Sequence, residues 1–420
     1  MFNRLSPLVL RGAVLASLGI AAAGGVHATN GYFSDAYGVK AEGEAGAGIA
    51  FPQDALTIAT NPAGLSAIPS SFDAGLDLFR PKRDATLVQG GAAQTFNGND
   101  TGNFFIPSIG YVRRLAPNLA AGVALFGNGG LNTDYGSNPF ARFGATGSAG
   151  VDLEQAFLSP ALSWSVTPNQ SLGIAANIAY QRFKAKGIGL FSGFSSDPAA
   201  VSDRGYDSSF GAGVRIGYIG HLNQYLAVGA TWQSRTKMGR FKKYAGLFAD
   251  QGEFDVPATY GVGLALTPTT AWTIALDWQE IKYSDVASVG NGINSLFSGV
   301  PLGATNGPGF GWRDVSVLKI GTTVNVNEQL TLRAGFSDNH QPIPASQTFF
   351  NVLAPGVVAA HITAGLSWRV SAQNELNLSV LHAIKKTVNG SGSLPPAFGG
   401  GEVNISLEEN ALGLGWSHHF

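Results

Sequence analysis

The sequence predicts an all-β fold: a transmembrane antiparallel β-barrel of about 14 strands, plugged by a small N-terminal hatch of short helices and loops. Three observations predict it. Apolar residues alternate with small or polar ones over segments of about ten residues, because successive strand side chains face lipid and lumen in turn. Charged residues make up only 13% of the chain, and 57 of its 420 residues are glycine, against usual shares of about 25% and 7%. The connections between the alternating segments are short and long in turn.

The first residues read as a secretory signal peptide. Arg4 and Arg11 precede a Gly/Ala/Leu-rich apolar run that ends in the small-x-small cleavage pattern Val26-His27-Ala28. After residue 28 no apolar run reaches the roughly 20 residues that a membrane-spanning helix needs. The expected organisation is therefore a signal peptide over 1–28, a hatch over 29–70 and a barrel over 71–420.

The alternation defines the strands. Within 271–279, for example, Trp272, Ile274, Leu276 and Trp278 share one face. Continued along the chain, the pattern predicts strands near residues 71–80, 104–114, 119–127, 153–166, 171–183, 206–219, 225–236, 254–266, 271–282, 315–325, 330–337, 361–369, 375–384 and 403–420. Short turns alternate with long segments near 81–103, 128–152, 184–205, 237–253, 283–314, 338–360 and 385–402. Because such barrels have short periplasmic turns and longer extracellular loops, the N-terminal segment is expected on the periplasmic side.

The end of the chain supports an outer-membrane location. Leu412, Leu414 and Trp416 lie on one face of the last predicted strand, and the chain ends on Phe420. This ending resembles the C-terminal recognition signal of outer-membrane barrels, which implies the barrel-assembly machinery as a partner. We therefore expect a multi-pass protein of the outer membrane of a Gram-negative bacterium, in contact with its lipid and lipopolysaccharide.

The segment between the cleavage site and the first strand has the composition of a plug. It is rich in Gly and Ala, contains one candidate short helix over 52–60, and ends in the turn-like Asn61-Pro62-Ala63-Gly64. Small residues permit close packing in a confined lumen. A barrel of about fourteen strands is too wide for its own side chains to fill, so this segment is expected to close it.

Several stretches resemble the FadL/TodX family, outer-membrane transporters of long-chain fatty acids and other hydrophobic compounds. The resemblance rests on TNGYFSDAYGVKAEGEAGAG (29–48) and PQDALTIATNPAGL (52–65) in the hatch. It extends to FDVPATYGVGLAL (254–266), DWQEIKYSD (277–285), GWRDVSVLKIG (311–321), LTLRAGF (330–336) and the Pro342-Ile343-Pro344 that follows.

The resemblance implies a route for a ligand. A hydrophobic molecule would be captured between the extracellular loops 184–205 and 237–253, move to a pocket in the lumen, and leave sideways through the wall after the hatch rearranges. The capture residues carried over are Leu190, Phe191, Phe194, Leu247 and Phe248, and the hatch motif is Asn61, Pro62 and Ala63. A kink in the third strand is placed at Gly122 or Gly127, since glycine permits bulges. The loop aromatics have a plainer interpretation, namely that they only pack the loops together.

Four charged residues fall on the lumen face of their strands: Arg215, Asp277, Lys319 and Arg333. Counted from the periplasmic turns, the last three reach similar heights and are predicted to form a cluster. Because buried charges must be paired, the first interpretation is a network that braces barrel to hatch. In the second, Arg215, Lys319 or Arg333 receives the carboxylate of a fatty acid.

Other classes of function have little support. A net charge of −1 argues against nucleic acid as a partner. Cysteine is absent, and the adjacent His418 and His419 point to opposite faces of a strand, so neither a metal nor another cofactor is expected. No catalytic residue is predicted and the protein is not expected to be an enzyme. The leading hypothesis is facilitated diffusion of long-chain fatty acids. TodX-like uptake of aromatic or aliphatic hydrocarbons is the main alternative, and an outer-membrane hydrolase or an open porin is a remote one.

Overall fold

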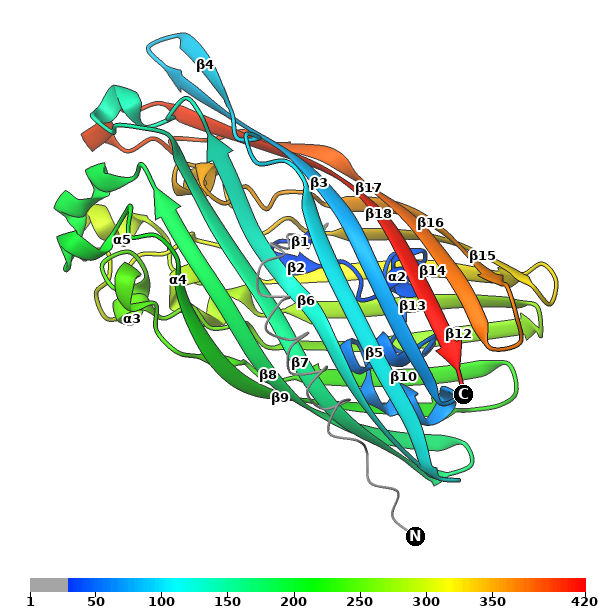
Figure 1. Ribbon diagram of the computed structural model, residues 1–420. Coiled ribbons are helices and arrows are strands. Elements are labelled where there is room, and N and C mark those ends of the chain that lie inside the picture. Colours follow the sequence, from blue (N-terminus) through cyan, green and yellow to red (C-terminus); the bar gives the residue numbers. More distant parts are fainter. Residues whose placement is uncertain (1–28) are drawn as a thin grey trace.

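The computed structural model describes residues 29–420, so the predicted signal peptide lies outside the described residues. Fourteen antiparallel strands form a closed wall in which each strand pairs with its neighbour in sequence (Figure 1). Pairing of the last strand with the first, from Glu402 with Val88 to His419 with Ser71, closes the barrel. The wall strands are β3 (Ser71–Gln89), β5 (Phe104–Ala116), β6 (Leu119–Tyr135), β7 (Ala149–Thr167), β8 (Gln170–Lys186), β9 (Asp207–His221), β10 (Leu226–Gln233), β12 (Thr259–Thr269), β13 (Trp272–Ile281), β14 (Val315–Asn325), β15 (Leu330–Asn339), β16 (Ala360–Arg369), β17 (Asn374–Val388) and β18 (Glu402–His419). The predicted fold class and strand number are confirmed.

Four further strands belong to the same sheet without forming part of the wall. They are β1 (Thr29–Asn30), β2 (Phe33–Ser34), β4 (Ala92–Asn97) and β11 (Lys237–Met238). The hairpin of β3 and β4 turns at Gly90 and Gly91, whose positive φ angles of 58° and 80° favour glycine. It projects beyond the rest of the wall (Figure 1).

Several strands extend farther toward the loops than the alternation predicted. Strand β3 continues to Gln89 instead of ending near 80, and β6 and β7 continue their pairing up to Tyr135 and Ala149. Strand β12, by contrast, begins at Thr259 instead of 254. Phe254 and Val256 are instead buried under the loops, where Val256 pairs with Thr236. Sequence alternation does not reveal these ends because hydrogen bonding between loops decides them.

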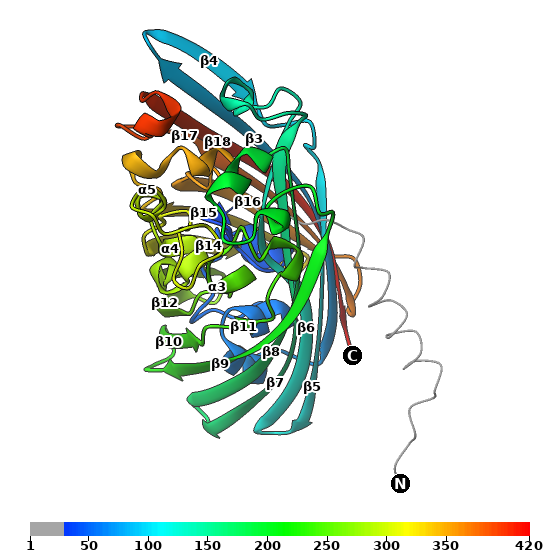
Figure 2. The same ribbon diagram turned by 90° about the vertical axis from the view of Figure 1, so that its left-hand side faces the viewer.

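The short helices of the loops gather at the end of the barrel opposite the short turns (Figures 1 and 2). They are α3 (Ala249–Gly252), α4 (Ala287–Gly290), α5 (Asn294–Phe297), η4 (Ala141–Phe143), η5 (Gly189–Phe194), η6 (Pro198–Ala200), η7 (Lys242–Tyr244), η8 (Tyr283–Asp285), η9 (Ala345–Gln347), η10 (Phe350–Val352) and η11 (Pro396–Phe398). Within residues 29–420, no helix combines the length and apolarity needed to cross a membrane.

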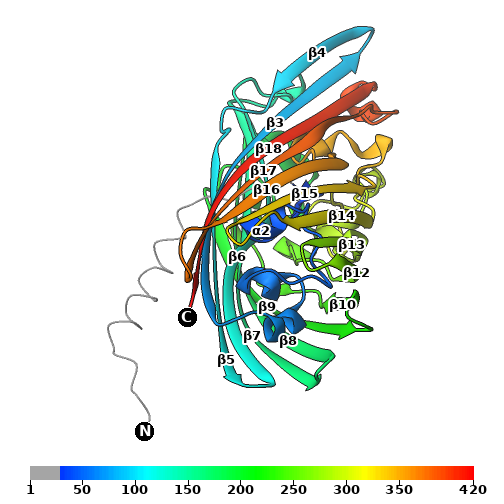
Figure 3. The same cartoon turned by 90° about the vertical axis from the view of Figure 1, so that its right-hand side faces the viewer.

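Residues 29–70, which we call the hatch, lie inside the barrel (Figure 3). Besides β1 and β2 the hatch contains α2 (Val39–Glu42), η2 (Ala55–Ala59) and η3 (Pro62–Ala67). The η2 helix falls within the predicted helix over 52–60, and its first turn is capped by the Asp54 side chain, which accepts from the Leu56 N–H.

Glycines on the lumen face make room for the hatch. A Cβ atom added at Gly263 would come within 2.8 Å of the Ile49 Cβ, and one added at Gly335 within 2.3 Å of the Glu44 carbonyl carbon. On the other face of β12, Val262 and Leu264 are exposed toward the surrounding membrane. The small residues of the alternation therefore mark where the wall touches the hatch.

Candidate functional site

The Asn61 turn fastens the hatch to the wall. The Asn61 side chain is fully buried, and its Oδ1 accepts from the Ala63 N–H at 3.1 Å. Its Nδ2 donates to the Ile49 carbonyl at 2.7 Å and to the Tyr218 carbonyl of β9 at 3.0 Å. One amide group thus orders the turn and ties it both to the rest of the hatch and to the barrel.

Pro62 and Ala63 continue this contact along the wall. Pro62 occupies the first position of η3, where its missing N–H costs nothing. The Ala63 carbonyl accepts from the Ser163 hydroxyl of β7 at 2.8 Å. A Cβ added at Gly173 of β8 would come within 2.1 Å of the Ala63 nitrogen. The three residues of the predicted hatch motif therefore lie together against β7, β8 and β9.

The three basic residues predicted in the lumen all reach the hatch. Arg215 donates to the Thr60 carbonyl at 3.1 Å and also to Gln233. Lys319 donates to the Asp35 carbonyl, and its ammonium lies 3.6 Å from the Asp35 carboxylate. Arg333 donates to the Gln53 side chain at 2.6 Å and to Ser367 at 2.7 Å.

The predicted cluster of Asp277, Lys319 and Arg333 does not form as expected. Asp277 and Lys319 are cross-strand neighbours, but Arg333 pairs with Thr323, farther along the ladder. The Asp277 carboxylate accepts from the backbone N–H groups of Gly48 and Ile49, at 2.7 and 2.9 Å. The position of a residue along its strand predicts the height of its side chain in the barrel but not the group to which it bonds. For Asp277 that group is the backbone of the hatch.

The hatch also buries acidic groups that sequence reasoning missed. Glu44 accepts from Thr323 and Gln53, and its burial raises the pKa from its ordinary value near 4.5 to about 8. Burial and the neighbouring Asp73 together raise the pKa of Asp54 to about 7. The sequence signal for these buried groups was the presence of acidic residues in an otherwise Gly/Ala-rich segment. A carboxyl group is buried at low cost only when it is hydrogen-bonded, paired with a cation or protonated.

Asp35 of the hatch comes together with Ser337 of β15 and His361 of β16. The Ser337 hydroxyl lies 2.9 Å from the His361 Nδ1 and 3.1 Å from the Asp35 Oδ1. The Asp35 carboxylate approaches the same ring nitrogen, at 3.9 Å. A hydrolytic triad places its hydroxyl and its carboxylate on opposite ring nitrogens. The three side chains instead form a buried polar group with Lys319.

An apolar cavity of about 40 Å³ lies among the long loops. Five phenylalanines line it, and Ser288 contributes the one polar side chain of its lining. The rings of Phe183 and Phe248 are 4.7 Å apart, and those of Phe191 and Phe350 are 4.9 Å apart. The lining comprises Val151, Phe183, Ile188, Phe191, Leu247, Phe248, Ser288, Leu302, Pro308, Gly309, Phe310, Phe350 and Leu353.

The predicted capture residues fall in and around this cavity. Phe191, Leu247 and Phe248 line it, whereas Leu190 and Phe194 are partly buried beside the same apolar cluster. Sequence reasoning missed the contribution of the loops 283–314 and 338–360, which supply Phe310 and Phe350. The available signal was the phenylalanines of these two loops, which stand in long segments flanked by polar residues. Sequence periodicity, however, does not show which loops pack against one another.

The third wall strand, β6, contains a register shift between Gly127 and Gly129. Its pairing with β5 ends at Leu125 and Ile109, so the upper part of β5 pairs only with β3. The hatch lies against this point, since the Gly130 N–H donates to the Tyr32 carbonyl at 3.0 Å. A Cβ at Gly129 would lie 1.8 Å from that carbonyl oxygen, so only glycine fits. Of the two predicted kink positions, Gly127 lies at the irregularity and Gly122 lies in regular pairing.

Among residues 29–420, no group of three or more His, Asp or Glu side chains is arranged to hold a metal ion. The described site therefore consists of a polar hatch interface, an interrupted wall and an apolar loop cavity.

Comparison with known proteins defines the class. A family model described as outer membrane protein transport protein (OMPP1/FadL/TodX) matches residues 19–420. The fold and this match define an outer-membrane channel for hydrophobic compounds. The chain belongs to the OMPP1/FadL/TodX family.

Solved structures agree with the fold. The P. putida toluene transporter TodX is 19% identical, with a TM-score of 0.69, and the match covers 92% of this chain and 99% of that one. A Pseudomonas aeruginosa FadL homologue is 14% identical with a TM-score of 0.69, covering 93% and 100%. The Ralstonia pickettii toluene transporter TbuX is 18% identical with a TM-score of 0.65, covering 92% and 99%. At these identities the likeness concerns the fold alone. A comparison with curated protein sequences gave no match.

Proposed function

We propose that the protein is a passive uptake channel for small uncharged hydrophobic compounds, with aromatic hydrocarbons favoured over long-chain fatty acids. The observation that carries this proposal is the loop cavity, whose lining contains five phenylalanines and no Lys, Arg or His. An apolar ring gains from burial and from edge-to-face contacts there. A carboxylate would lose its hydration without gaining a partner.

The lumen cations support the same choice. Arg215, Lys319 and Arg333 already bond to hatch or wall groups, and none of them lines the loop cavity. A fatty acid would have to displace one of these contacts before its head group was satisfied. An uncharged ligand has no such requirement.

The proposed route has three steps. The ligand enters the loop cavity, passes to the lumen, and is held there by the hatch until the Asn61 turn shifts. It then leaves sideways where β5 and β6 are unpaired above Ile109 and Leu125. This exit spares a hydrophobic molecule from crossing the periplasmic water. Assembly into the membrane through the exposed Phe420 completes the proposal.

Uptake by intact cells tests the substrate. The gene would be expressed in a Gram-negative strain without its own channels of this family, and uptake of radiolabelled toluene and oleate would be measured at the same surface expression. We expect faster toluene uptake and little change for oleate. Equal or greater stimulation of oleate uptake would contradict the proposal.

A second candidate, long-chain fatty acid uptake, is favoured by one observation, the presence of three cations beside the hatch. The double variant Lys319→Met/Arg333→Met separates the two functions. If one of these groups receives a carboxylate, the variant loses its preference for oleate over a neutral alkane. Lys237→Met/Arg240→Met, which alters two exposed cations, is the matched control. An unchanged preference rejects the fatty-acid role of the cations.

A further inference from the structure

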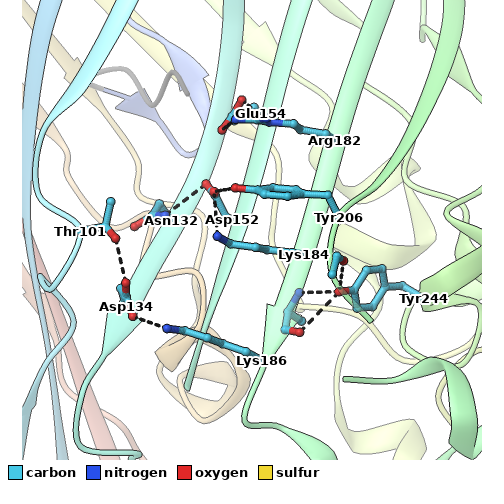
Figure 4. Close-up of polar contacts among 12 residues, drawn as sticks. Thr101, Asn132, Asp134, Asp152, Glu154, Arg182, Lys184, Lys186, Tyr206 and Tyr244 are labelled. Atoms are coloured by element: carbon cyan, nitrogen blue, oxygen red, sulfur yellow. Dashed lines mark hydrogen bonds and ion pairs between the residues drawn. The ribbon is translucent and has the colours of Figure 1, made fainter. Parts of the chain in front are cut away.

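A groove of charged side chains lies on the outer face of the wall, away from the ligand route. It crosses the loop-side ends of β6, β7 and β8, and the Tyr206 ring lies in it between Arg182 and Lys184 (Figure 4). On β7, Val151 and Leu153 point inward and are buried, so Asp152 and Glu154 lie on the outer face. The same alternation places Lys184 and Lys186 outside. None of these four side chains lines the loop cavity.

The groove lies at the height of lipid head groups. Directly below it the rings of Tyr180 and Phe210 are 5.2 Å apart, and Phe210 is 70% exposed. Such aromatic residues mark the membrane interface. Trp164 marks the opposite interface, ten residues after Glu154 along β7. At about 3.3 Å per residue and a tilt of about 40°, those residues rise roughly 25 Å, the height of an apolar belt.

The cations stand farther out than the acids. The Lys184 and Lys186 side chains are 40% and 36% exposed, whereas those of their partners Asp152 and Asp134 are 10% and 22% exposed. The Lys184 ammonium is 3.8 Å from Asp152, because Asp152 already accepts from the Tyr206 hydroxyl at 2.5 Å and from Asn132 at 3.1 Å. The surface that an approaching head group meets is therefore positive, although the groove as a whole contains as many acids as bases.

The lining is suited to a sugar as well as to a phosphate. Thr101, Asn103 and Asn132 supply hydroxyl and amide groups around a space of about 480 Å³ that opens to the exterior. The Asp134 carboxylate accepts from Lys186 and Thr101, both at 2.7 Å, which keeps it in place as an acceptor. Beside these polar groups, Phe105 is exposed on β5 and offers an apolar surface to acyl chains.

We propose that this groove binds the phosphorylated sugar head group of the glycolipid that forms the outer leaflet of the outer membrane. Its phosphate contacts Lys184 and Lys186, its hydroxyl groups contact Asp134 and Asn132, and its acyl chains lie below against Phe105 and Phe210. Charge complementarity at the correct height supports this occupant, and charge-assisted hydrogen bonds to phosphate are strong. The proposal is independent of the substrate that the channel carries.

Lipid binding in nanodiscs tests the proposal. Purified protein would be delipidated, and native mass spectrometry would count bound diphosphorylated lipid A, dephosphorylated lipid A and phosphatidylglycerol. We expect the diphosphorylated form to bind at least about tenfold more tightly than the dephosphorylated form. The variant Lys184→Gln/Lys186→Gln should lose this difference, whereas Lys237→Gln/Lys242→Gln, with the same change of charge at exposed positions outside the groove, should keep it.

The outcomes decide between the head-group site and a ladder of ion pairs that only braces the strands. Equal binding of both lipid A forms by the unaltered protein overturns the proposal, and that arm needs no variant to fold. Unchanged lipid A binding together with a lower unfolding temperature in Lys184→Gln/Lys186→Gln assigns the groove to bracing and also overturns it. Equally tight binding of phosphatidylglycerol overturns the glycolipid as occupant.

Discussion

The hatch interface and the loop cavity bury opposite kinds of side chain. At the interface between the hatch and the barrel wall, carboxylates, amides and cations contact one another through polar groups, as in the pair of Lys319 and Asp35. In the loop cavity, rings such as those of Phe191 and Phe350 contact one another and little else. Under the proposed function this difference is a division of tasks, in which directional bonds hold the hatch in place and the apolar surface accepts the ligand. Four predictions test this division, and the first three follow in order of decreasing expected effect.

The largest effect is expected for Lys319→Met. The change leaves the buried Asp35 carboxylate without its cation, and breaking a buried pair typically costs about 3–5 kcal/mol. Urea unfolding in detergent should show this loss, and planar bilayers should show new ion conductance as the hatch loosens. The exposed Lys237→Met is the control. A closed, equally stable variant would show that the ammonium does not brace the hatch.

A smaller effect is expected for Asn61→Ala. The variant removes the side-chain donor to the Ile49 and Tyr218 carbonyls, and a buried group left unsatisfied costs about 1–3 kcal/mol. We expect leakage of small polar solutes in liposome swelling, with hydrocarbon uptake retained. Asn118→Ala, in an exposed turn, should not leak. If Asn61→Ala stays sealed, other contacts hold the hatch.

A substitution in the loop cavity should lower ligand uptake and leave the channel closed. Phe191→Leu keeps the position apolar but removes the ring contacts with Phe140 and Phe350. Uptake of toluene at low concentration should fall by roughly tenfold or less, since aromatic contacts contribute about 0.5–1.5 kcal/mol, while bilayer conductance stays closed. Phe210→Leu, on the outer face, should change neither. Leakage in Phe191→Leu would mean that the two regions are not independent.

The fourth prediction is a dependence of hatch stability on pH. The pKa of Glu44 is raised to about 8, so between its ordinary value near 4.5 and about 8 the folded state binds more protons than the unfolded state. Stability therefore falls as the pH rises through this window. Gln53, Thr323, Arg333 and Asp277 face this carboxyl group. Urea unfolding from pH 5 to 8 should show a shallower decline in Glu44→Gln, with the exposed Glu328→Gln unchanged from the wild type. An identical decline in all three proteins would show that Glu44 does not cause the pH dependence.

Sequence patterns predicted the parts of the molecule that repeat. Alternation along segments such as 271–279 predicted the strands, and the alternation of short and long connections predicted that the N-terminal segment lies on the periplasmic side. The end of β3 was missed because it pairs with β4 and β18 beyond the predicted strand, and the start of β12 was missed because Val256 pairs with Thr236 instead. Phe310 and Phe350 were missed because nothing in a single sequence states which loops pack together. The height of Asp277 was predicted correctly, but its predicted hydrogen-bond partners were wrong, because its carboxylate accepts from the backbone of the hatch.

The central claim is that the ligand site is the uncharged loop cavity and that the buried cations only hold the hatch. Anomalous diffraction from crystals soaked separately with bromobenzene and with a brominated long-chain fatty acid tests it most directly. We expect a bromine peak from bromobenzene among Phe191, Phe248 and Phe350, with Lys319 and Arg333 still bonded to the hatch. A fatty acid whose carboxylate contacts Lys319 or Arg333, with no bromobenzene in the loop cavity, would contradict the claim.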